Sequence, residues 1–439
     1  MKEVIRLGLA GLGTVGGGTY AVLKRNARDL LAACGAELVV KTVACRNLER
    51  ARGVVDEGVE VTSDVHALAR DPDIDIVVEV MGGIEPARTL VLEAIAAGKH
   101  VVTANKALLA LHGNEIFDAA RRSGVVVAFE AAVAGGIPII KALREGLAAN
   151  RIEWVMGIIN GTSNFILTTM REKGLSFEEA LAQAQALGYA EADPTFDIEG
   201  IDAAHKITIL SALAFHTPVN FKAASVEGIT KLAAEDIEYA EEFGYRIKLL
   251  GITKRTARGI ELRVHPALVP KRRLMASVEG VMNAVVVKGD AVGTTLYHGR
   301  GAGAEPTASA VVADLVDIAR LMHGRRANPT YLAERMAALA PQDNTVWLPM
   351  DETVSSYYMR IGVADKPGVL ADIARIFADN AISIETMVQR GSEPGEESTE
   401  IVILTHSAVE GAVRRAIAAI EALDNVHGPV VMLRKEEMN

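Results

Sequence analysis

The sequence predicts an α/β protein with several domains, and three observations support that fold class. Short β-branched runs alternate with helical stretches over the first third of the chain. A glycine-rich turn follows the first of these runs directly. The carboxyl-terminal part has one strand and helix pattern of the βαββαβ type, which is typical of a ferredoxin-like domain. At roughly 150 residues per domain, a chain of 439 residues predicts about three domains.

The first third predicts a parallel sheet with helices on both faces, because each strand is followed by a helical stretch. One expected helix, Pro86–Ala97, has a proline near its start and Gly98 just past its end, which suits a capped helix. The other expected helix is Val15–Leu30, and the expected strands are Val4–Ala10, Glu37–Cys45, Ile74–Val80, Val101–Thr103 and Val125–Phe129.

The pattern changes after position 151, where strand-like runs mix with longer helices and predict a second, α+β domain. Its expected strands are Trp154–Ile159, Glu261–Val264 and Ala284–Lys288, and its expected helices are Ser176–Leu187, Gly200–Phe215 and Ala308–Met322.

A polar, aperiodic linker over Ala340–Ser356 precedes the ferredoxin-like tail. The tail is expected to contain the strands Tyr357–Val363, Ile382–Arg390, Thr399–Thr405 and Val430–Leu433, the helices Gly368–Asn380 and Val409–Leu423, and a polar turn over Gly391–Ser398. The expected domains are 1–135, 136–340 and 355–436, with the helix at about 305–325 packing back on the first.

Composition excludes several classes of protein. The 56 acidic residues outnumber the 46 basic ones, which argues against general nucleic-acid binding and against a polybasic membrane surface. Cys34 and Cys45 are too few for a disulfide framework or a cysteine-rich zinc site. The amino terminus does not read as a signal peptide, and the apolar stretch Val125–Ile140 is interrupted by Glu130 and Pro138. We therefore expect a soluble cytoplasmic protein.

The glycine-rich turn predicts a dinucleotide site. Because it lies between a strand and a helix near the amino terminus, it has the context of a Rossmann-type fingerprint. The first glycine permits the tight turn, the second lets the pyrophosphate approach and the third lets helix and strand pack closely. A glycine-rich turn without a ligand is the alternative. The motif comprises Gly11, Leu12, Gly13, Thr14, Val15 and Gly16.

Arg46 follows the second expected strand, where an NAD-preferring site usually places an acidic residue for the ribose 2′-hydroxyl. Arg50 and Arg52 add positive charge nearby, so a 2′-phosphate would meet no repelling carboxylate. We therefore expect NADP, with NAD possible. A solvated surface charge is the alternative for Arg46.

A second concentration of chemically useful residues lies around Asp202 and Lys206. These two are four positions apart and share a helical face. Their helix continues with mostly apolar residues, so the lysine is expected to be partly desolvated, which lowers a lysine pKa and suits proton transfer. The loop before it carries Glu191, Asp193 and Asp197, a cluster suited to an ammonium substrate. An ordinary surface salt bridge is the alternative.

The run from Ala184 to Lys206 resembles the homoserine dehydrogenase family. Four other stretches are similar to that family, so the resemblance spans roughly residues 4 to 325. They are Thr103–Lys106, Gly135–Pro138, Gly157–Phe165 and the loop Gly301–Gly303 with Pro306–Ala310. The tail motif Asp365-Lys366-Pro367-Gly368-Val369-Leu370 resembles an ACT domain, a module that senses amino acids.

The resemblance implies NAD(P)-dependent interconversion of L-homoserine and L-aspartate 4-semialdehyde, by a homodimer or homotetramer that pairs through the second domain. It implies L-threonine as the favoured effector of the tail. It also implies roles for residues of this chain: Lys206 and Lys106 in catalysis; Glu191, Asp202 and Asp197 at the substrate; Lys106, Gly188 and Gly303 at the cofactor; and Glu130, Val133, Gly135 and Ile137 around a monovalent cation, usually sodium.

Two other functions are weighed against this one. A semialdehyde dehydrogenase would form a thioester on a reactive cysteine, but Cys34 and Cys45 both lie in the cofactor-binding third of the chain. A non-catalytic nucleotide and amino-acid sensor would use the first domain and the tail for binding only, and it would have no need of the residues around Lys206.

Overall fold

The protein is described by a computed structural model that covers residues 3–323, 345–389 and 398–438 of the chain. The end of the expected 305–325 helix, the first part of the linker and nearly all of the expected Gly391–Ser398 turn lie outside these residues. The chain divides into two compact units. The first contains residues 1–161, 202–224 and 282–345, and the second contains 162–201, 225–281 and 346–439. The expected domains 1–135, 136–340 and 355–436 stay a prediction.

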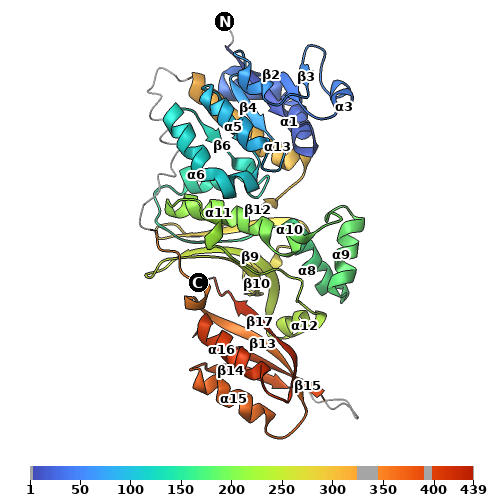
Figure 1. The fold of residues 1–439 in the computed structure, drawn as a ribbon, viewed down its shortest axis with the longest axis vertical. Coiled ribbons are helices and arrows are strands. Elements are labelled where there is room, and N and C mark those ends of the chain that lie inside the picture. The colour runs from blue at the N-terminus through green and yellow to red at the C-terminus, as the bar shows by residue number, and fades with distance from the viewer. Residues whose placement is uncertain (1–2, 324–344, 390–397, 439) are drawn as a thin grey trace. The chain divides into compact units, whose positions relative to one another are not determined.

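A six-stranded parallel sheet forms the centre of the first unit, as expected from the alternating pattern (Figure 1). Its order, β3-β2-β1-β4-β5-β6, is that of a Rossmann fold, with the switch point between β1 and β4. β3 was not predicted, because three residues show no periodicity. The strands are β1 (Glu3–Ala10), β2 (Ala36–Ala44), β3 (Glu60–Thr62), β4 (Ile76–Glu79), β5 (His100–Thr103) and β6 (Val127–Ala128).

The single helix expected over Val15–Leu30 is wrong. The chain forms α1 (Thr14–Arg25) and α2 (Ala27–Cys34), separated by Asn26, whose ψ of 14° leaves the helical range. Helices α5 (Ala87–Ala96) and α6 (Lys106–Ser123) also pack in this region of the first unit. The short helices α3 (Leu48–Arg52) and α4 (Ala67–Arg70) complete this region.

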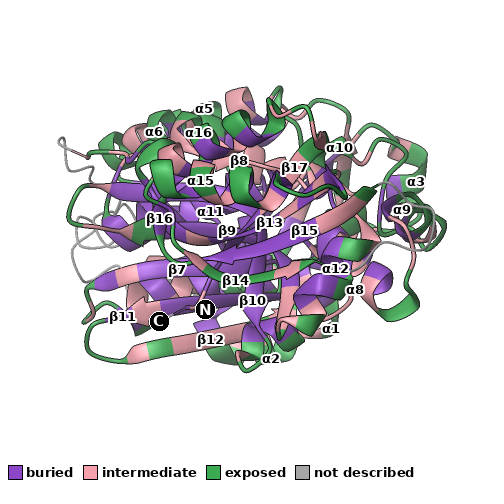
Figure 2. Ribbon diagram, turned by 90° about the horizontal axis from the view of Figure 1, so that it is seen from below, coloured by how far each residue is buried: buried purple, intermediate pink, exposed green. Residues whose placement is uncertain are grey.

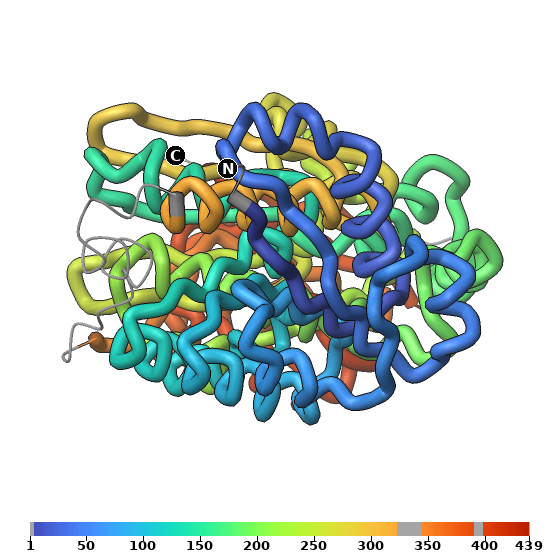
Figure 3. The backbone as a smooth tube through the Cα atoms, turned by 90° about the horizontal axis from the view of Figure 1, so that it is seen from above, coloured from blue at the N-terminus to red at the C-terminus, as the bar shows by residue number. Residues whose placement is uncertain are grey.

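Helix α13 (Ala304–His323), far along the chain, lies beside α1 and α2 in the same unit (Figure 3). Leu7, Tyr20 and Leu315 share one hydrophobic core. Gly18 allows the close approach, because a Cβ there would overlap the backbone of Ala304.

Three antiparallel strands also belong to the first unit: β7 (Ile152–Ile158), β11 (Met282–Gly289) and β12 (Gly293–Arg300). Helix α11 (Ile201–Phe215), apart from its first residue, belongs there too. Every residue of α11 from Asp202 onward is buried, as expected of a helix with few polar positions.

The second unit contains two structural groups. One is a hairpin of β9 (Tyr245–Arg255) and β10 (Ile260–Pro270), with β8 (Ser225–Val226) beside β10. The helices of this group are α8 (Gly161–Lys173), α9 (Phe177–Ala186), α10 (Thr195–Ile198) and α12 (Ala234–Glu242).

The other group is the expected βαββαβ module, with strand order β17-β13-β15-β14. Strands β13 and β15 are largely buried (Figure 2). The module contains β13 (Val354–Ala364), α15 (Val369–Asp379), β14 (Ile384–Gln389), β15 (Ser398–Thr405), β16 (Ala408–Val409), α16 (Glu410–Glu421) and β17 (Val426–Lys435).

The module is tied to the rest of its unit by a buried ion network. β17 pairs in parallel with β10. The fully buried Arg434 donates to Glu410 at 2.9 Å within the module and to Glu227 at 2.8 Å after β8. Removing one partner of a buried pair leaves an uncompensated charge, so the module cannot be deleted without disturbing its neighbours.

In the part of the chain that the structure describes, no helix combines the length and the hydropathy needed to cross a bilayer.

Candidate active site

The glycine turn has the geometry of a phosphate-binding loop. Gly11 has a φ of 100°, which L side chains rarely adopt, and a Cβ on Gly16 would overlap the carbonyl oxygen of Gly11. The space around Gly13 is open, and α1 begins there without a side-chain cap. Exposed N–H groups at a helix N-terminus bind phosphate, so the residues present fit the pyrophosphate of a dinucleotide.

Arg46 lies just beyond the carboxyl end of β2 and is exposed. Among the described residues no carboxylate forms an ion pair with it. The Gly11 N–H donates to Ala44 at 2.8 Å, so the end of β2 is held beside the glycine turn. The charge of Arg46 is therefore accessible to a ligand at this edge of the sheet.

Lys206 is buried as expected, with 8% of its surface exposed. Its ammonium donates to the carbonyl oxygen of Ile159 at 2.7 Å and to Oδ2 of Asp202 at 2.7 Å. The pair is thus an internal one, and the surface salt bridge weighed as an alternative is wrong.

Asp202 connects two lysines from distant parts of the first unit. Its Oδ1 lies 3.0 Å from Nζ of Lys106, at the start of α6, and its Oδ2 also accepts from Asn160 at 2.8 Å. Burial by itself would raise the pKa of Asp202. The charges of Lys206 and Lys106 and the hydrogen bonds outweigh burial and hold this pKa well below its ordinary value. The carboxylate therefore stays ionised.

His205 does not compete with Lys206 as a proton carrier. Its ring packs 4.5 Å from the ring of Phe221, measured between centroids. Desolvation, reinforced by the charges of Lys106 and Lys206 and only partly opposed by that of Asp202, lowers its pKa to about 4. The imidazole is neutral at physiological pH.

The other expected substrate residues belong to the second unit. Glu191 is exposed in the turn after α9, and its backbone carbonyl accepts from Gln185 at 3.1 Å. Asp197 lies in α10, and its backbone carbonyl accepts from Ser163 at 2.9 Å. Gly188 has a φ of 74° and open space around it.

Glu130 lies within a buried acidic pair of the first unit. Its two carboxylate oxygens accept from the N–H groups of Ile140 and Lys141, each at 2.8 Å, and its own N–H donates to Asp314 at 2.8 Å. Burial raises the pKa of Glu130 to about 7, against the hydrogen bonds and Arg144. Burial and the charge of Glu130 raise the pKa of Asp314 well above its ordinary value.

The backbone of the expected cation site turns sharply next to Glu130. Ala134 and Gly135 both have positive φ, 57° and 51°. A Cβ on Gly135 would overlap Gly301. This turn therefore lies against the loop Gly301–Gly303, which directly precedes α13. Among the described residues no three His, Cys, Asp or Glu side chains are placed to hold a metal, so any cation here would depend on backbone carbonyls.

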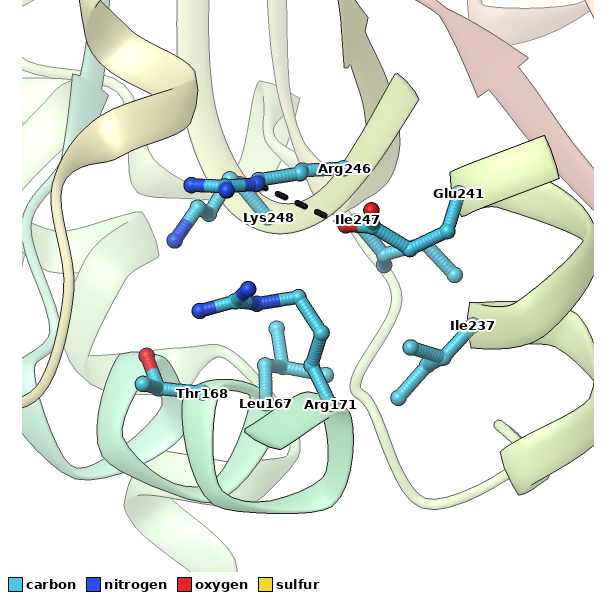
Figure 4. Close-up of a pocket in the computed structure, with 8 residues that line it drawn as sticks. All are labelled: Leu167, Thr168, Arg171, Ile237, Glu241, Arg246, Ile247 and Lys248. Carbon is cyan, nitrogen blue, oxygen red and sulfur yellow. Dashed lines mark ion pairs between the residues drawn. The ribbon is translucent and has the colours of Figure 1, made fainter. Parts of the chain in front are cut away.

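The second unit has a separate cluster of charges around a small cavity (Figure 4). Arg171, Arg246 and Lys248 all pair with Glu279, at 3.2, 2.6 and 3.5 Å. Burial lowers the pKa of Lys248 to about 8. Because Glu279 is shared by these three cations, and Arg171 and Arg246 pair also with Glu172 and Glu241, the cluster is an ion network that provides a comparison for Lys206.

Comparison with known protein families identifies the chain. Residues 138–316 match the family model of homoserine dehydrogenase, and residues 11–130 match the model of the homoserine dehydrogenase NAD-binding domain. The chain belongs to the homoserine dehydrogenase family. It is accordingly an oxidoreductase that uses a nicotinamide cofactor, and its residues 357–425 match the ACT domain model.

Two curated homoserine dehydrogenases are similar to the chain over its full length and theirs, at 57% identity for that of Neisseria gonorrhoeae and 55% for that of Pseudomonas aeruginosa. The crystal structure of a homoserine dehydrogenase from Thiobacillus denitrificans is 58% identical, covers 100% of both chains and has a TM-score of 0.94. A hyperthermophilic archaeal homoserine dehydrogenase in complex with NADPH is 26% identical over 73% of this chain and 98% of its own, with a TM-score of 0.62.

Sequence reasoning does not predict two contacts of Lys206 and Asp202 in this chain. Asn160 was noted only within a family motif, and the carbonyl of Ile159 was not noted. An asparagine two residues after a buried strand is the available signal for the first. No pattern identifies a backbone carbonyl as an acceptor.

Gly16 and Gly17 provide a matched test of the dinucleotide turn. Gly16→Ala would force Gly11 to move, whereas a Cβ on Gly17 meets nothing within 4 Å. We expect Gly16→Ala to weaken NADPH binding by at least about tenfold, the equivalent of ~1.4 kcal/mol. Gly17→Ala should bind like the unaltered protein. Fluorescence titration with NADPH measures both, and equal affinities would contradict this account of the turn.

Proposed function

We propose that the protein catalyses the reversible reduction of L-aspartate 4-semialdehyde to L-homoserine, with Lys206 as the proton-transfer residue. The observation that supports it is the contact of Lys206 and Lys106 with the buried carboxylate of Asp202 in a chain of this family. A sensor would have no use for two lysines on one buried carboxylate. A thioester mechanism is disfavoured because Cys34 is buried and Cys45 lies at the end of β2.

The residues present supply the binding and proton chemistry of this reaction. A nicotinamide, when bound, would supply the hydride chemistry at C4 of the substrate. Lys206 holds at Nζ the proton that an alkoxide formed at C4 needs, and Asp202 keeps that nitrogen in place. The ammonium of Lys106 forms an ion pair with the other carboxylate oxygen of Asp202. Lys106 would contact the nicotinamide and the substrate. Glu191, Asp197 and Asp202 are the proposed acceptors for the ammonium group of the substrate.

A monovalent cation, sodium in the first instance, is proposed beside Glu130, with the backbone carbonyls of Val133, Gly135 and Ile137. The support is the buried Glu130 and Asp314 pair, because burial disfavours two adjacent carboxylates that no cation compensates. The positive φ values at Ala134 and Gly135 mark a turn of the kind that can gather carbonyl oxygens. A cation there would brace the loop next to Gly301 and Gly303.

NADP is the proposed cofactor, with NAD as a possible second one. Arg46 supports this proposal through its exposed charge at the end of β2. Gly188 and Gly303 are proposed as further cofactor contacts. We further propose a homodimer or homotetramer in the cytoplasm.

Lys206→Met should lower kcat by roughly 10²–10⁴-fold, the usual value of general acid–base catalysis. NADPH affinity should stay nearly unchanged, because Lys206 lies outside the glycine turn. The matched control is Lys248→Met, which removes another buried lysine. Both variants are checked by thermal melting, and the assay follows NADPH oxidation with aspartate semialdehyde. A folded Lys206→Met protein with kcat within about tenfold of the original would rule out the assignment.

Arg46→Asp should shift preference from NADP towards NAD. The aspartate would repel a 2′-phosphate and could accept a hydrogen bond from the ribose 2′-hydroxyl. The measurement is kcat/KM with each cofactor, and Arg70→Asp, another exposed arginine of this unit, is the control. A ratio that stays unchanged in Arg46→Asp would place Arg46 outside the adenosine pocket.

The ACT domain is the proposed binding place of L-threonine, and inhibition should follow from different threonine affinities of two states of the enzyme. Gly368 has a φ of 101° at the turn between β13 and α15, so Gly368→Val strains the tail motif without removing Arg434. We expect millimolar threonine to inhibit the full chain, and Gly368→Val to shift the curve to higher threonine. A full chain insensitive to threonine would refute this regulation.

A further inference from the structure

Glu79 is a buried acid at the centre of the sheet edge that receives the cofactor. It is the last residue of β4, opposite Ala10 of β1 on one side and Thr103 of β5 on the other. Its side chain is completely buried. The carboxyl ends of β1 and β4 form the topological switch point, where ligands of such sheets bind.

The carboxylate of Glu79 accepts hydrogen bonds from groups at the ends of two strands, β4 and β5. Its Oε2 accepts from the hydroxyl of Thr103 at 2.7 Å, and its Oε1 accepts from the N–H of Met81 at 2.9 Å. Further hydrogen bonds come from the side chain of Asn105 and the N–H of Gly82. These contacts are donors, so they favour the ionised carboxylate and oppose the effect of burial, which raises the pKa of Glu79 above its ordinary value.

These hydrogen bonds continue into the turn that carries Lys106. The hydroxyl of Thr103 accepts from the N–H of Asn105 at 3.0 Å. The side chain of Asn105 caps α6 by accepting from Leu108 at 3.1 Å, and it donates to Gly83 at 2.6 Å. Lys106 is the first residue of α6. The carboxylate is thus joined, through Thr103 and Asn105, to the first turn of α6, which begins with Lys106.

We infer that Glu79 is a positioning residue for Lys106, holding its ammonium on Asp202 at the reaction site. This inference rests on the proposed function, because it assigns Lys106 a part in the reaction. Glu79 makes its hydrogen bonds with the hydroxyl of Thr103 and with the turn after β4. Its effect passes through Thr103 and Asn105, the two polar residues on either side of Ala104.

A double-mutant cycle tests this inference with the full chain. Glu79→Gln keeps the shape of the side chain but replaces one accepting oxygen by an NH₂ group. That group would face hydrogen-bond donors. We expect kcat to fall roughly tenfold to a hundredfold, as for a catalytic group displaced by about an ångström. In the Lys106→Met background the same substitution should cost less than about threefold. The matched control is Glu115→Gln, which alters an exposed acid on α6, the helix that begins with Lys106.

Thr103→Val supplies an independent second variant, because it removes the hydroxyl and preserves the shape. It should reproduce the loss of kcat and the non-additivity with Lys106→Met, and it also covers the case in which Glu79→Gln does not fold. Equal fold losses in both backgrounds would show a merely structural role and overturn the inference. Unaltered kcat in Lys106→Met would instead refute the proposed role of Lys106, and wild-type inactivity with homoserine would refute the proposed function.

Discussion

The need to compensate one buried negative charge organises the reaction site. Asp202 is 3% exposed on a helix buried along almost its whole length, and an ionised carboxylate there is costly unless it is paired and hydrogen-bonded. Lys206, Lys106 and Asn160 provide that compensation from three separate segments. Any substitution that removes one lysine therefore alters charge balance as well as chemistry, which is why the lysine tests need folding and cofactor-binding controls.

The same requirement links the reaction chemistry to the cofactor-binding fold. Lys106 reaches Asp202 only because it starts α6 directly after β5, at the carboxyl edge of the parallel sheet. The glycine turn starts α1 after β1 at that edge. Parallel strands bring such turns together regardless of their distance in the sequence. The fold thus places the glycine turn at the start of α1 and the ammonium of Lys106 along one sheet edge without a dedicated loop for either.

Sequence reasoning succeeded where the determining pattern is local. The Rossmann strands, the burial of Lys206 and the βαββαβ tail follow from periodicity, glycine and proline positions within short windows. The break between α1 and α2 was missed because Asn26 interrupts an otherwise continuous helical pattern, and the hairpin of β9 and β10 was underestimated because its buried strands do not alternate. The pairing of Lys106 with Asp202 depends on tertiary structure, and no spacing rule reveals it. Only the family resemblance brought Lys106 into consideration.

The buried Arg434 network constrains how the tail can influence catalysis. Glu227 accepts from Arg434, and the residues directly after it contact the turn that leads into α11: Ile229 donates to Ile198 at 2.8 Å, and Thr230 donates to Glu199 at 3.0 Å. Helix α11 then carries Asp202 and Lys206. A movement of β17 must either break its pairing with Glu227, which leaves buried charge uncompensated, or carry this segment with it. Contiguity of contacts does not by itself demonstrate coupling. It does mean that Arg434 of the tail and the turn at Ile198 and Glu199 both contact one short stretch of backbone, residues 227–230.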